Sequence, residues 1–396
     1  MLFGFRFIRF RVLAIALGLL AQVYLFLRFR QAVRWPPLDG VARRFFWPAT
    51  ILLGGFFALS AYLLFRPVTW VDPPGVVQAL LLVPAAVWSF GSIFSALLLF
   101  GVRLTGGLGR RMVRVLRGRT PAPPTGHLDR RRFLQASVGS LAAAPFVVSG
   151  YGAAYASRHP ELAEVRLPFG VPLRVVQLTD IHAGLYMNRG EMRAYADRAN
   201  ALQPDLCVLT GDYISNSVAF LPECIEEMAR VRPRYGTYAI LGNHEHWYAR
   251  LDQIRPVFDR IGIPLLNNEH RIVDTERGAF VLAGIDDLAS GEPDLETALL
   301  GRDPALPVLL LSHHPEVFPE AARRGIQLTL SGHWHGGQVK LRLPGVDISL
   351  AHLRTHYPEG LYRIDASHLY VSRGIGTTFT PVRLNAPPEV TLFHLR

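Results

Sequence analysis

Thiols are scarce in this sequence of 396 residues, which contains only two cysteines, Cys207 and Cys224. Cys207 lies inside the apolar run 206–209, which is typical of a buried strand. The spacing of the two cysteines neither requires nor excludes a disulfide, so it leaves the redox compartment open. The polar motifs described below contain no cysteine, which argues against a closed structural zinc site.

Carboxylates are scarce in the first third of the chain. Residues 1–132 contain 18 arginines, three aspartates and no glutamate, whereas residues 133–396 contain 24 basic and 28 acidic side chains. The formal net charge of +11 therefore belongs entirely to the N-terminal part. There the arginines flank apolar runs, as they do in membrane proteins. The C-terminal part has no basic stripe, so we expect no nucleic-acid partner.

Three long apolar runs precede residue 103, at about 12–27, 47–65 and 74–102. A membrane-spanning helix needs roughly 20 apolar residues, and almost no acidic or lysine side chain interrupts these runs. We therefore predict three transmembrane helices within residues 1–102; the alternative is a set of buried helices in a soluble domain. Residues 103–132 are rich in arginine, glycine and proline, which predicts a basic cytoplasmic linker rather than a folded unit.

A fourth apolar run, at residues 133–150, directly follows Arg130-Arg131-Arg132. This arrangement resembles a twin-arginine export signal; the alternative is a fourth span flanked by inside-facing arginines. Both interpretations place residues 103–132 in the cytoplasm and the residues that follow the run outside. We therefore predict a multi-pass protein of a bacterial-type inner membrane, with a catalytic domain at residues 157–396 on the periplasmic face.

From about residue 173, short apolar runs alternate with amphipathic stretches. This pattern predicts an α/β domain of two layered sheets flanked by helices, preceded by the all-α transmembrane region. The expected strands are 174–178, 206–209, 237–241, 280–283, 308–311, 328–330, 339–343, 369–372 and 390–394, and the expected helices are 189–202, 222–231, 250–261 and 315–324.

Five polar motifs in this half each follow an expected strand. They are Asp180-Ile181-His182, Gly211-Asp212, Gly242-Asn243-His244-Glu245, Ser312-His313 and Gly332-His333-Trp334-His335. Because ligands of open α/β sheets gather at the carboxyl ends of strands, we expect these side chains to converge. Oxygen and imidazole ligands suit a pair of divalent metal ions that holds water. We expect the glycines before Asp212, Asn243 and His333 to permit sharp turns.

These motifs, in this order, resemble those of the calcineurin-like metallophosphoesterase superfamily over roughly residues 172–396. The segments 332–338, 372–376 and 387–389 resemble its membrane-associated or exported branch, which acts on phosphodiester or lipid-linked substrates. The resemblance implies two divalent metal ions (Mn, Fe, Zn or Co) that share Asp212. It implies that Asp180, His182, Asp212 and His335 hold one metal, and that Asp212, Asn243, His313 and His333 hold the other.

The same resemblance implies a catalytic role for His244, which would protonate the leaving oxygen or stabilise the transition state after a metal-activated water attacks phosphorus. We expect Glu245 to orient His244 and His314 to line the pocket. Weaker candidates for approaching the substrate are His246, His352, His356 and Arg373, and Trp247, Tyr248, Trp334 and Tyr357 are weaker candidates for an apolar rim.

The resulting prediction is a membrane-anchored phosphohydrolase, a phosphodiesterase or pyrophosphatase whose phosphate-ester substrate is lipid-linked in one version. One alternative is a catalytically silent metal-binding sensor or scaffold on a membrane anchor. Another is a transport unit in residues 1–102, against which the lack of charge inside the apolar runs argues. The motifs leave the metal identity, the substrate and the oligomeric state open.

Overall fold

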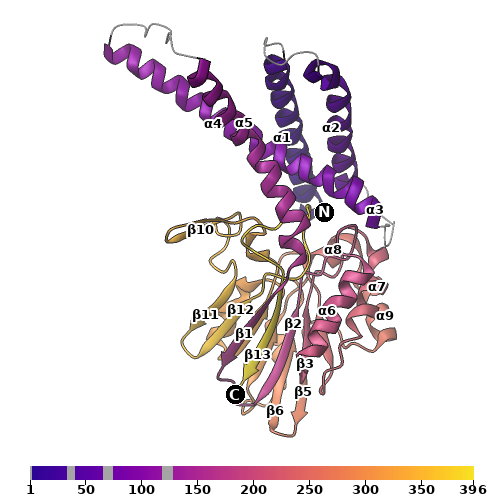
Figure 1. Ribbon diagram of the computed structural model, residues 1–396. Coiled ribbons are helices and arrows are strands. Elements are labelled where there is room, and N and C mark those ends of the chain that lie inside the picture. Colours follow the sequence, from indigo (N-terminus) through magenta and orange to yellow (C-terminus); the bar gives the residue numbers. More distant parts are fainter. Residues whose placement is uncertain (1, 34–40, 66–74, 118–127) are drawn as a thin grey trace. The chain divides into compact units, whose positions relative to one another are not determined.

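The computed structural model describes residues 2–33, 41–65, 75–117 and 128–396 (Figure 1). The predictions for the loops at residues 34–40 and 66–73, and for the middle of the linker, concern residues outside these ranges. The chain divides into two compact units. The N-terminal unit comprises Met1–Arg66 and Ala79–Tyr151, and the C-terminal unit comprises Pro67–Gln78 and Gly152–Arg396.

Residues described before β1 are helical. The helices are α1 (Leu2–Val33), α2 (Val41–Phe65), α3 (Gly75–Val77), the π-helical turn η1 (Gln78–Leu82), α4 (Val83–Arg117) and α5 (Leu128–Ala154). Four stretches are long and apolar enough to cross a membrane: Arg11–Gln31, Arg44–Leu64, Gly75–Leu108 and Ser137–Arg158. The π-helical turn precedes Pro84, whose missing N–H and ring disturb the regular hydrogen-bond ladder one turn earlier.

The linker prediction is wrong in one respect, because α4 continues as regular helix through residues 103–117. Gly106 and Gly107 do not stop it. Each glycine costs a helix only about 1 kcal/mol relative to alanine, and the following residues 110–117 are mostly arginine, methionine, valine and leucine, which tolerate helix well. Only residues 118–127, which the structure does not describe, separate α4 from α5.

The C-terminal unit contains two sheets and a separate hairpin (Figure 1). The first sheet has the order β1-β13-β2-β3-β4, and the second has the order β11-β12-β8-β7-β6-β5. The strands are β1 (Glu161–Leu167), β2 (Leu173–Leu178), β3 (Leu206–Thr210), β4 (Thr237–Ile240), β5 (Glu269–Thr275), β6 (Gly278–Gly284), β7 (Val308–Leu311), β8 (Leu328–Ser331), β9 (Leu341–Leu343), β10 (Val346–Ile348), β11 (Gly360–Ile364), β12 (Ser367–Val371) and β13 (Glu389–Leu395).

Three hydrophobic layers hold the two sheets and their helices together. The central layer joins residues of both sheets, among them Val175 and Val208 from the first and Leu282 and Leu309 from the second. The outer face of the first sheet packs against α6, α7 and α9, and that of the second packs against α10 and α11. The C-terminal helices are α6 (Arg189–Ala201), α7 (Leu221–Met228), α8 (Asn243–Tyr248), α9 (Leu251–Ile261), α10 (Leu295–Leu299) and α11 (Phe318–Arg323). The expected α/β fold of two layered sheets flanked by helices is therefore confirmed.

The expected strands are all present, and those that the sequence pattern misses lie mostly at sheet edges. β1, β5 and β11 are edge strands, and β10 belongs to the separate hairpin. An edge strand buries little of its surface, so β1 and β5 carry many charged side chains and lack a long apolar run. Apolar periodicity therefore detects the central strands, which position the polar motifs.

Candidate metal centre

The polar motifs lie where strands of both sheets end. Asp180 follows β2, Asp212 follows β3 and Asn243 follows β4, all in the first sheet. His313 follows β7 and His333 follows β8, both in the second sheet. These five strands run parallel within their sheets, so their carboxyl ends share one edge. The convergence expected from the strand pattern is therefore present in the structure.

The backbone at this edge is unusual. Five of the seven expected ligands have positive φ angles without being glycine: Asp180 (52°), His182 (51°), Asp212 (55°), His333 (72°) and His335 (52°). Side chains with a Cβ seldom adopt this conformation, and it persists where the surrounding structure enforces it, often at functional sites. The strain turns each side chain from its strand end toward the common centre.

The glycines before the ligands act in two different ways. Gly211 has a φ of 93°, so it makes the expected sharp turn. Gly242 and Gly332 do not have positive φ; a Cβ at Gly242 would collide with the carboxylate of Asp212, and one at Gly332 with that of Asp180. The turn prediction is therefore wrong for these two, whose lack of a side chain leaves room for the acidic ligands.

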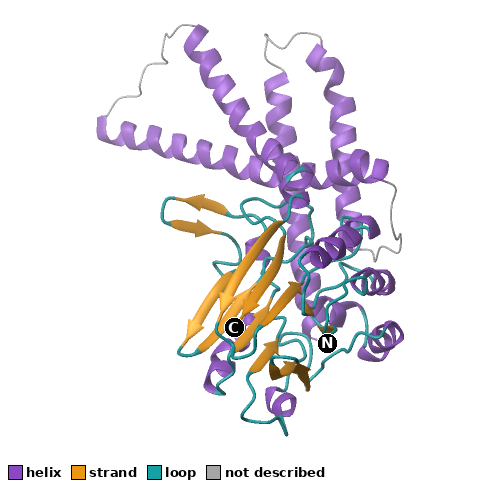
Figure 2. Ribbon diagram, turned by 60° about the horizontal axis from the view of Figure 1, so that its bottom comes forward, coloured by secondary structure: helices purple, strands orange, loops and turns teal. Residues whose placement is uncertain are grey.

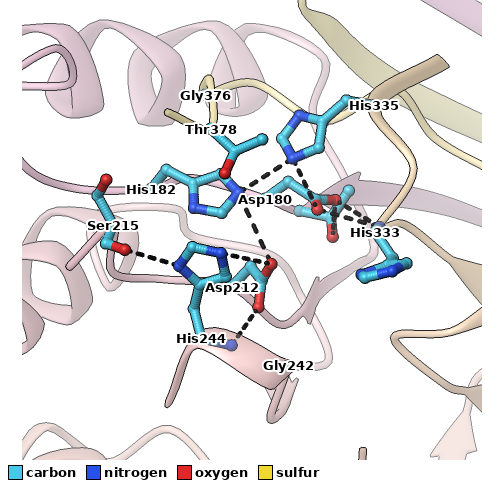
Figure 3. Close-up of polar contacts among 12 residues, drawn as sticks. Asp180, His182, Asp212, Ser215, Gly242, His244, His333, His335, Gly376 and Thr378 are labelled. Carbon is cyan, nitrogen blue, oxygen red and sulfur yellow. Dashed lines mark hydrogen bonds and ion pairs between the residues drawn. The ribbon is translucent and has the colours of Figure 1, made fainter. Parts of the chain in front are cut away.

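Asp180, His182 and His335 form one group of mutually close ligand atoms, and Asp212 lies beside His182 (Figure 3). The Nε2 atom of His335 lies 3.3 Å from Oδ1 of Asp180, and Nε2 of His182 lies 3.7 Å from Oδ2 of Asp212. The two Nε2 atoms face each other at 3.0 Å. Two imidazole nitrogens and a carboxylate in mutual reach, with a second carboxylate beside His182, are a donor set that suits a divalent cation.

Asp212, His313 and His333 form another group of mutually close ligand atoms, and Asn243 follows β4 at the same edge. The Nε2 atom of His313 lies 3.3 Å from Oδ2 of Asp212. Within the described part of the chain, Oδ1 of Asn243, Nε2 of His313 and Nδ1 of His333 are buried without a hydrogen-bond partner. Buried polar atoms are seldom left unsatisfied, so these orphaned acceptors fit a cation beside Asp212.

Burial adjusts the charge of this cluster. Burial lowers the pKa of His182 to about 3, and burial together with neighbouring histidines holds the pKa of His333 and of His335 well below the usual value. Burial alone would raise the pKa of Asp212, but His313 and His244 hold it well below its ordinary value. Burial therefore keeps His182, His333 and His335 in the neutral form that binds metal. Burial would also lower the pKa of His313, but the carboxylate of Asp212 raises it well above its usual value.

His244 lies against the shared carboxylate (Figure 3). Its Nδ1 donates to the carbonyl of Ser215 at 2.7 Å, and its backbone N–H donates to Oδ1 of Asp212 at 2.9 Å. The bond to Ser215 fixes the ring, and it leaves Nε2 pointing toward the centre, 4.0 Å from Oδ2 of Asp212. His244 therefore presents a free ring nitrogen beside the expected metal ligands.

Glu245 has a different role from the expected one. Its buried carboxylate accepts the backbone N–H groups of Gly242, Asp212, Tyr213 and Ile214 at 2.8–3.2 Å. The prediction that Glu245 orients the ring of His244 is wrong, because the carbonyl of Ser215 does so. Glu245 instead shapes the loop that carries Asp212. Burial raises the pKa of Glu245 to about 8, and the hydrogen bonds from Gly242 and Ile214 act in the opposite direction.

His314 lies beside the centre but faces away from Asp212. Its ring packs on that of His333 with centroids 3.7 Å apart, and its Nε2 lies 3.2 Å from Oδ2 of Asp287. His246 of α8 pairs with Asp286 at 2.7 Å, and Asp286 and Asp287 both belong to the loop after β6. The sequence motifs do not single out either aspartate, because the segment Gly284-Ile285-Asp286-Asp287 at the end of β6 contains no histidine that would mark a ligand motif.

Arg383 is a third residue that the sequence pattern misses. It is fully buried, and its guanidinium donates to Nδ1 of His335 at 3.1 Å and to the carbonyls of Arg373, Gly374, Gly376 and Ala386. Together with burial and the neighbouring His182, the fixed positive charge of Arg383 lowers the pKa of His335 and so favours its neutral ring.

The weaker candidates have other partners. The guanidinium of Arg373 is held by Glu389 at 2.7 Å and by Glu161 at 2.9 Å, so it ties β1 to the start of β13. The indole N–H of Trp334 donates to Glu316, and Nδ1 of His352 contacts Oγ of Ser349. These contacts give each side chain a structural role.

Both cysteines are buried and free, so the disulfide that the sequence left open does not form.

Comparison with known proteins shows which family this chain is similar to. Residues 173–337 match the calcineurin-like phosphoesterases. An uncharacterised metallophosphoesterase of Bacillus subtilis is 30% identical over 282 residues, which cover 68% of this chain and 98% of that protein. A phosphodiesterase of Escherichia coli is 29% identical over 68% of this chain and 99% of its own length.

A transmembrane protein with a metallophosphoesterase domain, from Danio rerio, is 32% identical over 63% of this chain. The match spans 60% of that protein, less than two thirds of its length.

Proposed function

Because the chain belongs to the calcineurin-like phosphoesterase family, a family of metal-dependent hydrolases of phosphate esters, we propose that it is a membrane-anchored phosphodiesterase or pyrophosphatase. One observation carries the proposal. Asp180, His182 and His335 form one group of mutually close ligand atoms, His182, Asp212 and His244 form the next, and Asp212, His313 and His333 form the last. Two shared residues thus link three groups into one continuous site.

We assign the metal ligands as the resemblance implies. Asp180, His182, Asp212 and His335 would hold one divalent cation, and Asp212, Asn243, His313 and His333 would hold the other. A pair of such cations supplies an activated water and neutralises charge on the phosphoryl oxygens.

The chain's own residues would do the remaining work. Glu245 holds the loop of Asp212 through four backbone N–H groups, so the shared carboxylate keeps its place during the reaction. The bond from His244 to Ser215 keeps Nε2 of His244 facing the site. When that nitrogen carries a proton, it can donate it to the leaving oxygen. Gly242 and Gly332 leave the space that the carboxylates of Asp212 and Asp180 occupy.

We further propose that residues 157–396 form the catalytic domain and that the four apolar helices anchor it. Their length and composition support a multi-pass anchor. The related protein of Danio rerio is named as a transmembrane protein, which also favours membrane attachment. The arginines of residues 103–132 favour a cytoplasmic position for that segment, and therefore the outer face for the catalytic domain. A lipid-linked phosphate ester suits an enzyme that is confined to a bilayer.

The test uses the full chain, purified in detergent and loaded with Mn²⁺ or with Zn²⁺. We expect faster hydrolysis of a chromogenic phosphodiester than of the matching monoester, and loss of both activities after chelation. Two bound metal ions without turnover of either ester would favour the silent scaffold instead. A reporter fused after Arg396 that is active only in the cytoplasm would contradict the proposed orientation.

A further inference from the structure

The hairpin formed by β9 and β10 has one apolar face. In its antiparallel register Leu343 pairs with Val346, and Leu341 pairs with Ile348. Paired residues share a face of a two-stranded ribbon, so these four aliphatic side chains line one side. They are 40–56% exposed. The hairpin belongs to neither of the two large sheets, and Figure 2 shows it projecting from them.

The opposite face of the hairpin is charged. Arg342 pairs with Asp347 across the strands, and their side chains lie 3.4 Å apart. Lys340 lies 3.3 Å from the same carboxylate. The turn between the strands is Pro344-Gly345, in which Gly345 has a φ of 79°. This is the combination that a type II turn requires. The hairpin is therefore a defined amphipathic ribbon.

The apolar surface continues beyond the strands. Leu350 and Leu353 follow β10 and are 74% and 75% exposed, more than any of the four strand residues. Single exposed leucines are ordinary on a protein surface, but here six exposed aliphatic side chains fall within thirteen residues, and such a concentration of exposed apolar residues is typical of an interaction site. A two-stranded ribbon is also marginally stable in water by itself, so a covering partner would stabilise it.

The hairpin emerges directly from the metal centre. His335 begins the 3-10 turn η5 (His335–Gly337), and β9 starts four residues after Gly337, the end of that turn. A Cβ on Gly337 would collide with Ser349, so the end of β10 returns to the same turn. A molecule that touches the apolar face therefore lies close to the segment that carries His333 and His335.

The base of the hairpin also lies beside the end of α5. The backbone N–H of Lys340 donates to the carbonyl of Leu384 at 2.9 Å, and that of Arg383 donates to the carbonyl of Gly152 at 3.3 Å. Gly152 belongs to the C-terminal unit and to the candidate span Ser137–Arg158. Within the C-terminal unit, the hairpin base and Gly152 are therefore joined through one short segment, 383–384.

We propose that this hairpin inserts its apolar face into the surface of a lipid bilayer and holds the metal centre at the interface, where the phosphate ester that the enzyme cleaves belongs to a membrane lipid. The bilayer is the occupant that the chain itself indicates, because four helices of the same polypeptide suit a membrane. On the opposite face the side chain of Arg342 stays exposed to water, as do the polar faces of other amphipathic elements that lie on membranes. The identity of the substrate rests on the proposed function, whereas the insertion does not.

Fluorescence of the full chain tests the insertion. Leu343→Cys places a label on the apolar face, and Leu300→Cys places one on an exposed leucine outside the hairpin. Both native cysteines are buried, so an environment-sensitive thiol probe reports on the introduced positions. The labelled proteins are reconstituted in vesicles of phosphatidylcholine and phosphatidylglycerol, with or without phosphatidylcholine that carries a nitroxide on its acyl chain.

We expect the nitroxide lipid to quench the probe at position 343 and aqueous iodide to leave it unquenched, with the opposite result at position 300. Quenching of position 343 by iodide alone would overturn the insertion. Protection of position 343 from both quenchers would also overturn it, because the apolar face would then be covered by protein.

Activity separates the two proposals. Turnover of a soluble chromogenic diester without lipid quenching contradicts the insertion and supports the proposed function. Lipid quenching without turnover supports the insertion and contradicts the proposed function.

For the lipid substrate, the readout is the rate on a vesicle-embedded phosphodiester divided by the rate on the soluble diester. We expect this ratio to fall in the double variant Leu343→Ser/Ile348→Ser. An unchanged ratio would overturn the lipid assignment, and a misfolded variant would lower both rates together.

Discussion

The two units of this protein differ in which side chains they expose and which they bury. In the N-terminal unit large apolar residues such as Leu13, Ile51 and Leu80 are exposed. In the C-terminal unit the sheets bury their apolar residues, and ionisable groups such as Asp212 and Arg383 are buried with them. An apolar exterior is stable only against an apolar surrounding, whereas a buried charged cluster requires partners.

The contrast shows how each unit satisfies its polar groups. The helices of the N-terminal unit satisfy their backbone groups internally, so they can expose leucine and isoleucine without leaving polar groups unpaired. The sheets of the C-terminal unit bury enough apolar surface to hold strained, charged loops at their carboxyl ends. The predictions below test one unit against the other.

The largest effect is expected from Asp212→Asn, which removes the carboxylate shared by the two expected ligand sets. We expect the rate on a diester to fall well beyond the roughly 10–100-fold that loss of an outer partner costs. The metal content should fall below two ions per chain by elemental analysis. Glu276→Gln, an exposed acid on the same unit, is the control. Full metal content in Asp212→Asn would show that the two metal ions do not depend on a shared Asp212 carboxylate.

His244→Ala should lower kcat by about 10²–10⁴-fold, which is the usual contribution of a positioned acid or base. Both metal ions should stay bound, because the expected ligand sets do not include His244. The control is His270→Ala. His270 lies in edge strand β5, and its ring contacts the carbonyl of Ala298 in α10. Loss of a metal ion together with the rate would make His244 a ligand.

Ile51→Asp tests the apolar exterior of the N-terminal unit. A carboxylate near the middle of a membrane helix costs about 2.5–3.5 kcal/mol, so we expect less of the chain to resist extraction from membranes at high pH. Leu300→Asp is the matched control, because Leu300 is 76% exposed and Ile51 is 72% exposed. Equal behaviour of the two variants would mean that α2 faces water.

Arg383→Met removes the buried guanidinium beside His335. We expect a loss of roughly 10–100-fold in metal affinity, and a loss of about 1–3 kcal/mol in the free energy of unfolding for each carbonyl left without a donor. Metal titration followed by calorimetry measures the first, and chemical denaturation measures the second. Arg277→Met, on an exposed turn, is the control. Unchanged metal affinity would limit Arg383 to a structural role.

The smallest effect is expected at Glu227, whose carboxylate accepts hydrogen bonds from Arg193 and Arg189. These bonds hold the pKa of Glu227 below its ordinary value of 4.5. A lowered pKa in the folded state adds stability above the unfolded pKa, and this stability is lost as the pH falls through the folded pKa. Glu227→Gln should therefore cost up to about 1 kcal/mol at pH 7.

The same variant should lose less stability on acidification than the wild type does. Denaturation at pH 7 and at pH 3 measures both values, and Glu276→Gln again serves as the control. Parallel loss of stability in the wild type and in Glu227→Gln would show that other carboxylates dominate the acid response.

The sequence predicts the central strands and the ligand motifs well, because both follow from local rules. Apolar runs such as 308–311 coincide with β7, and each polar motif directly follows its strand. It fails where a residue depends on distant neighbours. Arg383 lies in a segment without regular structure, and its partners come from the His335 motif and from residues 373–386. No local pattern marks such a residue.

The sequence by itself therefore determined the reaction class, the apolar helices and the order of the ligand motifs, because side-chain chemistry and short periodicities are local properties. Only the tertiary structure decided that Glu245 supports the Asp212 loop rather than His244, and that Gly242 and Gly332 make room for carboxylates. The tertiary structure alone also places an amphipathic hairpin beside the metal centre. Those features bring together residues that lie far apart in the sequence, and the distances between their side chains are fixed by packing rather than by spacing along the chain.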